Sequence, residues 1–289
     1  MVKEAAMAQR FRKLVVAYDF SPAAEKALED AIAIAKRLGA EILVAHVRAP
    51  GEGSLDSCSS LRDMETENSS DLEVIRGRLG ALGLRSREIS RAGAVGDTLF
   101  NICSEEDADL LLLGAYGYGP QDRQTLGSTA EHLLRAMTCP VLTYGPCVTS
   151  SISSAGNLGP LLVPIPFPCT RAQLQKAGLI ATLFERPLEL LHCEAQHDGK
   201  SSANEPPESL EQQCEQLALQ YRSEGLRVSW SVLYGEPAAT IVSRGRSLRS
   251  PFILMPLRWG KRLSSITSDN VAAHVIRQTN LPVMTYKVD

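Results

Sequence analysis

Short, continuous apolar runs alternate along this chain with longer segments in which apolar residues recur every three or four positions. The first run covers 14–18 and ends at Asp19. Ser21 and Pro22 then mark the start of a helix, because Ser is a favoured N-cap and Pro suits the first helical position. The apolar face of that helix consists of Leu28, Ala31, Ile32, Ala35 and Leu38. Apolar runs of this kind are typical of strands buried on both faces of a parallel sheet.

The same pattern occurs a second time. A new apolar run covers 161–163, and Thr170 with Gln173 forms a possible capping box before a second amphipathic helix. That helix carries its apolar face 146 positions after the first one, and the same shift relates His46 to His192. The expected strands are 14–18, 41–47, 86–91, 109–113, 140–144, 161–163, 228–233, 252–255 and 282–286. Further helices are expected over about 71–84 and 210–224, and after Gly96 and Gly235, which we match to each other.

Strands that alternate with helices predict an α/β protein. We expect two doubly wound domains, each a mainly parallel five-stranded sheet with helices on both faces. Domain 1 is expected over 1–148 and domain 2 over 160–289. The Ser-rich stretch 149–159 is expected to be a flexible linker.

Composition narrows the class of protein. The chain has 289 residues, of which 44% are hydrophobic, enough for two ordinary cores. A formal net charge of −3 gives no basic field for nucleic acid. No apolar run reaches about 18 residues, so we expect a cytoplasmic protein without a membrane partner. The seven cysteines lack CxxC spacing, which argues against a disulfide framework and against a zinc ribbon.

One loop predicts a phosphate site. Gly114-x2-Gly117-x9-Gly127-Ser128-Thr129 lies between an apolar run and an amphipathic helix. Glycines let backbone amides approach a phosphate and permit positive φ angles, and a helix N-terminus attracts anions. Asp19 would face the same crevice if the first and fourth strands are neighbours.

Simpler explanations of these residues stay open. Ser128 and Glu131 also form a capping-box pattern, and Asp19 could merely stiffen a turn. The loop is not a Walker motif, because it has no Gly-Lys-Ser/Thr, and it follows the fourth strand, unlike the dinucleotide fingerprint.

The second copy has lost the glycine loop. Pro256, Trp259, Asp269 and Asn270 stand 142 positions after Gly114, Gly117, Gly127 and Ser128, and Pro166 replaces Asp19. Asp269 would repel a phosphate. Three basic residues could hold another anion there, although a solvated charge run or a salt bridge explains them more simply: Arg258, Lys261 and Arg262.

Catalytic and metal chemistry receive little support. His192, Cys193 and His197 could be imagined as metal ligands, but the match of His192 to His46 favours packing. Cys58 lies in a polar loop without a neighbour that would activate it. We therefore expect no metal site made by side chains, and no catalytic residues are assigned.

Several motifs together resemble the universal stress protein family. They are Asp19-Phe20-Ser21-Pro22, His46-Val47, Gly96 before a helix, Ala108-Asp109-Leu110 to Gly114, the glycine loop, and Cys139-Pro140-Val141-Leu142. The resemblance covers nearly all of the first repeat. The second repeat resembles the family in its strands, its helices and Leu281 to Met284, but not in its binding loop. The whole chain thus resembles a tandem member with the Rossmann-like fold of that family.

This resemblance implies a protein that binds ATP or another adenine nucleotide and acts in a stress response as a sensor or signalling protein. The nucleotide would contact Asp19, Phe20, Ser21, Val47, Gly114, Gly117, Gly127, Ser128 and Thr129, with Mg or Mn as the cation. Only the first repeat would bind it. Because closing strands of the family pair between subunits, an intramolecular pseudo-dimer through 141–144 and 283–286 is implied, and a homodimer stays open. The alternatives are a nucleotide-free scaffold that binds another protein, and a slow ATPase.

Overall fold

The computed structural model describes residues 11–49, 71–116, 126–152, 158–167, 169, 171–194, 209–258 and 271–288. The strands are β1 (Lys13–Ala17), β2 (Glu41–Arg48), β3 (Ser86–Ala92), β4 (Leu110–Gly114), β5 (Val141–Tyr144), β6 (Leu161–Pro164), β7 (Leu188–Glu194), β8 (Val228–Tyr234), β9 (Ile253–Arg258) and β10 (Val283–Val288). The helices are α2 (Pro22–Leu38), α4 (Val95–Glu105), α5 (Ser128–Ala136), α6 (Arg171–Leu183), α7 (Leu210–Ser223), α8 (Pro237–Ser247) and α9 (Val271–Gln278), with an unlabelled helix over 71–81.

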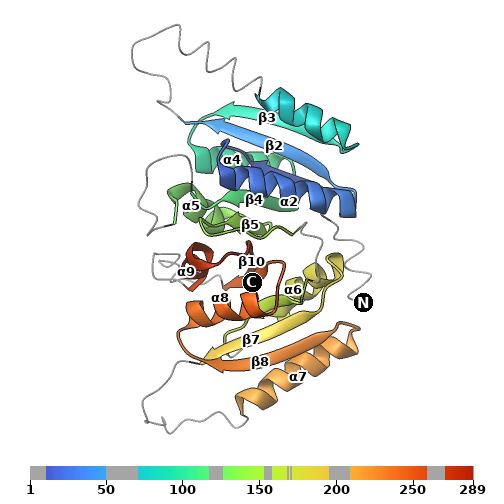
Figure 1. The fold of residues 1–289 in the computed structure, drawn as a ribbon, viewed down its shortest axis with the longest axis vertical. Coiled ribbons are helices and arrows are strands. Elements are labelled where there is room, and N and C mark those ends of the chain that lie inside the picture. The colour runs from blue at the N-terminus through green and yellow to red at the C-terminus, as the bar shows by residue number, and fades with distance from the viewer. Residues whose placement is uncertain are drawn as a thin grey trace.

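All ten strands form one continuous sheet in the order β3-β2-β1-β4-β5-β10-β9-β6-β7-β8 (Figure 1). Within each half the strands are parallel, and the two halves have the same order from the middle outward. The exception is the central pair, β5 and β10, which is antiparallel, with Thr143 opposite Val283 and Val141 opposite Thr285. The predicted doubly wound α/β fold is confirmed, and its two sheets are joined edge to edge.

Helices cover both faces of this sheet, as the continuous apolar runs predicted. One core cluster joins alternate strand residues such as Leu14 and Leu112 to α2, the 71–81 helix, α6 and α7. The other joins the intervening residues, such as Val15 and Leu111, to α4, α5, α8 and α9. Both clusters run through the two halves, so the repeats share their cores across the central strand pair.

The start of α2 matches the sequence prediction. The Ser21 hydroxyl accepts the N–H of Ala24 at 3.1 Å, and Pro22 is the first helical residue. The helix ends at Gly39, whose φ of 70° is left-handed and whose N–H donates to the Ala35 carbonyl at 2.8 Å. Local signals therefore set both ends of this helix.

A buried carboxylate ties the chain segment after β5 to the first repeat. Asp30 of α2 is fully buried and accepts hydrogen bonds from the Tyr144 hydroxyl at 2.7 Å, from the Ile152 N–H at 2.9 Å and from the Ser151 hydroxyl. On the other side of the segment, the N–H groups of residues 149 and 150 donate to the Asn280 carbonyl. The first residues of the predicted linker are thus bonded to both repeats.

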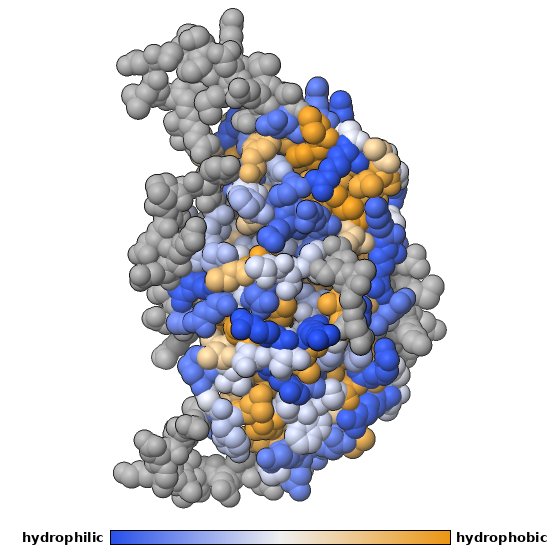
Figure 2. Space-filling model, in the orientation of Figure 1, coloured by the Kyte–Doolittle hydropathy of each residue, from blue (hydrophilic) through white to orange (hydrophobic). Residues whose placement is uncertain are grey.

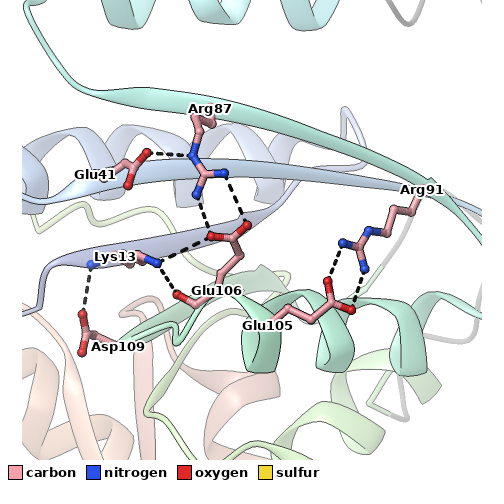
Figure 3. Close-up of polar contacts among 7 residues, drawn as sticks. All are labelled: Lys13, Glu41, Arg87, Arg91, Glu105, Glu106 and Asp109. Carbon is pink, nitrogen blue, oxygen red and sulfur yellow. Dashed lines mark hydrogen bonds and ion pairs between the residues drawn. The ribbon is translucent and has the colours of Figure 1, made fainter.

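Charged side chains fix the end of α4 against the sheet (Figure 3). Glu106 pairs with Arg87 of β3 at 2.6 Å and with Lys13 of β1 at 3.6 Å, and Arg91 pairs with Glu105 at 2.6 Å. Arg87 and Arg91 lower the pKa of their glutamate partners, Glu106 and Glu105 respectively. These pairs are largely exposed, so each contributes little to stability.

The surface offers no large apolar face in the view of Figure 2, where apolar patches are broken by polar side chains. Among the described helices, none combines the length and apolar character needed to cross a bilayer.

Candidate functional site

The carboxyl ends of β1 and β4 lie side by side, as the glycine-loop hypothesis requires. The two strands are paired in parallel, with Val16 opposite Leu112. Gly114 ends β4 directly against the start of α2, since a Cβ added there would lie 3.0 Å from Cβ of Ala23 and 3.8 Å from Oγ of Ser21. The chain leads from β1 to β2 on one side of β1, and β4 lies on the other side. The winding of the sheet therefore reverses between β1 and β4, and ligands of doubly wound folds bind at such a switch point.

Asp19 stiffens the turn between β1 and α2. Its Oδ1 accepts the N–H of Ser21 at 3.0 Å, and the intervening Phe20 has a left-handed φ of 63°. This is the simpler role considered for Asp19. The carboxylate is nevertheless exposed, and no described residue donates to its Oδ2. One oxygen therefore orders the turn while the other stays open to a ligand.

Phe20 and His46 hold the ends of β1 and β2 together. The two rings pack edge to face with their centroids 5.1 Å apart, and Nδ1 of His46 lies 2.8 Å from the Tyr18 carbonyl oxygen. This contact fixes the end of β2, where Val47 is half-buried and pairs with Arg91 of β3. Val47 is thereby placed at the same edge of the sheet as Asp19.

Tyr18 supports this turn from the core side. Its hydroxyl donates to Oε2 of Glu25 at 2.8 Å, and Glu25 also pairs with Arg78 of the 71–81 helix. Burial, and then the hydrogen bond to Glu25, raise the pKa of Tyr18 above its ordinary value. The phenol therefore stays neutral and links the turn to two helices.

Gly114 and Gly127 are required by close approach and not by left-handed backbone. The Gly127 N–H donates to the Ala115 carbonyl at 3.1 Å, and a Cβ at Gly127 would lie 2.7 Å from that oxygen. The φ of Gly127 is −59°, and Gly114 has no positive φ either. The expectation of positive φ is wrong for Gly114, and Gly117 lies outside the described residues.

The N-terminus of α5 carries no side-chain cap. Gly127 is its N-cap residue, and Ser128 is the first helical residue and exposed. The capping box of Ser128 with Glu131 does not form, because the Glu131 N–H donates to the Gly127 carbonyl and its carboxylate pairs with Arg135. At the same edge, α2 has its first turn capped by Ser21. Within the described residues, no side chain caps the first amides of α5, including that of half-buried Thr129, and such amides attract anions.

The second repeat differs at the matching edge. Strand β4 leaves its partner after Gly114 pairs with Tyr144, whereas β9 continues past Pro256 and pairs Leu257 with Lys287 and Arg258 with Val288. Continuous strand therefore takes the place of the turn at Gly114. Pro166 occupies the position of Asp19 and is exposed. The remaining replaced positions, together with two basic residues, lie outside the described residues: Trp259, Lys261, Arg262, Asp269 and Asn270.

One glycine pair was matched incorrectly from the sequence. Gly235, with φ 145°, corresponds to Gly93, with φ 152°, because each follows its strand directly and donates its N–H to the last residue of the neighbouring strand. Gly96 serves another purpose: a Cβ there would lie 2.9 Å from the ring of His132. The shift of 142 positions that relates the closing segments would have identified Gly93.

His192 has the packing role of its counterpart His46. Its Nδ1 lies 3.0 Å from the Ile165 carbonyl oxygen, its ring packs on Phe167, and its Nε2 lies 3.1 Å from Oε2 of Glu194. His197 and Cys58 lie outside the described residues. Within the described part of the chain, no group of three or more His, Cys, Asp or Glu side chains has a geometry suited to a metal ion.

Known proteins resemble this chain in the sequence of its first repeat and in the fold of its whole length. Residues 10–144 match the model of the universal stress protein family. A universal stress protein of Methanocaldococcus jannaschii is 27% identical over 139 residues, which is 46% of this chain and 81% of that protein. The crystal structure of a universal stress protein from Archaeoglobus fulgidus covers 97% of this chain and 98% of its own, with a TM-score of 0.73 and 20% identity. A second structure from Archaeoglobus fulgidus, solved in complex with dAMP, is 22% identical, covers 45% of this chain and 98% of its own, and has a TM-score of 0.35.

The sheet order and the loop at its switch point place the protein in the class of doubly wound α/β proteins, with two repeats in one chain. The likeness to the first Archaeoglobus structure extends this fold over both repeats. Within this class, the first repeat, residues 10–144, matches the universal stress protein family.

Proposed function

We propose that the first repeat binds an adenine nucleotide, ATP with Mg or Mn, and that the protein acts as a nucleotide-dependent sensor or signalling protein in a stress response. One observation carries the proposal: the uncapped start of α5 and the open carboxylate oxygen of Asp19 lie at one switch point. The family resemblance gives these positions nucleotide-binding roles.

The chemistry of the edge suits the parts of a nucleotide. The α5 amides at Ser128 and Thr129 and the helix dipole would hold phosphate oxygens. Because Gly114 and Gly127 have no Cβ, the backbone can lie close around the proposed phosphate position. Asp19 would accept hydrogen bonds from ribose hydroxyl groups, and the backbone of Val47 would meet the adenine. The dAMP bound by the Archaeoglobus fulgidus protein belongs to the same chemical class of ligand.

We also propose one nucleotide per chain. In the second repeat, β9 continues through the position where β4 turns away at Gly114, and a proline replaces Asp19. Neither the turn nor the acid that would hold a nucleotide is then present.

The chain is proposed to consist of domain 1 over 1–148, a linker over 149–159 and domain 2 over 160–289. The antiparallel pairing of β5 and β10 supports an arrangement of the two domains as an intramolecular pseudo-dimer. In that arrangement the second domain serves as a permanent partner of the first, and the unidentified protein that receives the signal would bind the pair.

The replacement Thr129→Asp tests the site with a matched control. A carboxylate in the first turn of a helix is compatible with the helix dipole but repels a phosphate. We expect at least a tenfold loss of ATP affinity, measured by isothermal titration calorimetry with Mg. Val271→Asp is the control, because Val271 stands 142 positions later, at the start of α9 in the second repeat.

Equal ATP affinities in the two variants would remove α5 from the binding site. Absence of ATP binding by the unaltered protein would favour the scaffold hypothesis, and release of ADP that Thr129→Asp abolishes would favour a slow ATPase. Gly127→Asp is a poorer test, because a side chain at Gly127 meets the Ala115 carbonyl and disturbs the loop itself.

A further inference from the structure

A cavity lies between the two repeats, at the edge of the sheet opposite the candidate nucleotide site. It has a volume of about 250 Å³. The first repeat contributes Phe11, Asp109 and Cys139, which precede β1, β4 and β5, and α6 of the second repeat contributes Lys176, Leu179 and Leu183. We call this space the seam cavity. Because it needs residues of both repeats, a single-repeat protein could not form it in one chain.

The wall of the seam cavity is mainly apolar. Leu179 and Leu183 are one helical turn apart on α6, so their side chains share a face. Phe11 is only 6% exposed and packs edge to face on Phe184, with ring centroids 6.5 Å apart. A volume of this size is slightly below the range of about 300–1,000 Å³ for drug-sized ligands, so a small molecule fits best.

Lys176 supplies a positive charge at this wall. Its Nζ donates to the Lys287 carbonyl at 2.9 Å, which uses one of the three donors of the ammonium group. No carboxylate of the described residues lies within ion-pair distance of Lys176. Burial, and then the charge of Lys176, lower the pKa of Lys287, whose own Nζ donates to the Ala136 carbonyl at 3.1 Å. Lys176 and Lys287 thus both lie at the seam, joined by the hydrogen bond from Lys176 to the Lys287 carbonyl.

Asp109 does not neutralise Lys176. Its Oδ2 accepts the backbone N–H groups of Arg12 at 2.7 Å and of Lys13 at 3.0 Å, which ties this carboxylate to the start of β1. An anion entering the cavity would therefore bind at the Lys176 side, and an apolar body would extend along α6 towards Phe11.

We propose that the seam cavity binds a small carboxylate with an apolar body. The carboxylate would pair with Lys176, and the body would cover Leu179, Leu183 and Phe11. The ligand would bridge the two repeats, since its charged end is held by the second repeat and its apolar end contacts both. This site is independent of the nucleotide site, so either proposal can fail alone.

Octanoate and octylammonium test the charge requirement on the full, nucleotide-free protein by isothermal titration calorimetry. We expect one octanoate per chain and at least tenfold weaker binding of octylammonium, which has the same chain and the opposite charge. Failure of octanoate to bind at about 1 mM, or equal binding of the two compounds, would overturn the proposal.

Variants at two residues of the cavity wall, Lys176 and Leu183, test whether octanoate binds in the seam cavity. Lys176→Met should weaken octanoate binding at least tenfold and Lys176→Arg should restore it, whereas Lys36→Met, at an exposed position of α2, should leave it unchanged. Leu183→Asp should also abolish binding, and its control is Leu219→Asp on α7, where Leu219 is 54% exposed. Unchanged octanoate affinity in Lys176→Met and in Leu183→Asp would show that octanoate binds elsewhere and would refute the site.

Discussion

At the scale of single residues, the second repeat has an ion pair with a buried carboxylate where the first has apolar side chains. Glu189 of β7 has a side chain only 4% exposed; it pairs with Arg244 of α8 at 2.6 Å and accepts a hydrogen bond from Ser231 at 3.0 Å. The matching residues of the first repeat are Leu43 and Ile102, both fully buried. Such pairs often contribute less to stability than apolar side chains of similar size.

Glu189→Leu should therefore lower the free energy of unfolding by about 1–3 kcal/mol, because it leaves Arg244 without its buried partner. The double variant Glu189→Leu/Arg244→Ile should recover most of that loss, because the first repeat already has leucine and isoleucine at the two matching positions. Chemical denaturation measures both, and Glu211→Leu on the exposed side of α7 should change stability by no more than about 0.5 kcal/mol. A double variant less stable than the single one would contradict the account.

The sequence predicted individual residues well where their roles depend on near neighbours. Ser21 and Pro22 begin α2 as expected, and Gly114 lies beside the turn that follows Asp19. The helix expected to open at Gly127-Ser128-Thr129 is α5, and the alternative of a capping box between Ser128 and Glu131 does not form. Contacts between distant segments were not predictable, and the hydrogen bond from the Tyr144 hydroxyl to Asp30 is an example.

At the scale of elements, helix starts differ in what satisfies their first amides. The carboxylate of Glu236 caps α8 by accepting the N–H groups of Ala238 at 3.0 Å and Ala239 at 2.6 Å. These backbone bonds lower the pKa of Glu236. The starts of α4 and α5 have no such side-chain cap, and of these two it is α5 that follows β4 at the switch point.

Because the folded-state pKa of Glu236 is lowered, its stabilising effect is present above the ordinary glutamate pKa of about 4.3 and is lost as the pH falls through the folded value. Glu236→Gln should therefore reduce stability at pH 7 and make the loss of stability between neutral and acid pH smaller. Thermal unfolding across that range is the measurement. A variant with the same pH dependence as the unaltered protein would show that the cap does not contribute.

At the scale of the whole molecule, the two repeats are joined at the central strands into one sheet. Gly145, just after β5, packs against α9 of the other repeat, where an added Cβ would lie 1.9 Å from the Ile276 carbonyl oxygen. Apolar and polar patterns predicted two sheets, but their fusion depends on contacts between residues about 140 positions apart. That distance explains why pattern alone could not show how the halves are joined.

Gly145→Ala should destabilise the protein by about 1–3 kcal/mol, because the new methyl group cannot fit without moving the seam. Gly77→Ala is the control, since Gly77 lies in the 71–81 helix with open space around it, and alanine favours a helix by up to about 1 kcal/mol. Thermal unfolding of both variants gives the comparison. Equal stability of the two would mean that the repeats do not pack closely at Gly145.

The central claim is that one repeat binds a nucleotide and the other does not. Equilibrium dialysis of the full chain with labelled ATP and Mg measures this directly as a stoichiometry. We expect one ATP per chain in the unaltered protein and in Val271→Asp, and almost none in Thr129→Asp. Two ATP molecules per chain, or one that persists in Thr129→Asp, would contradict the assignment of the site to the first repeat.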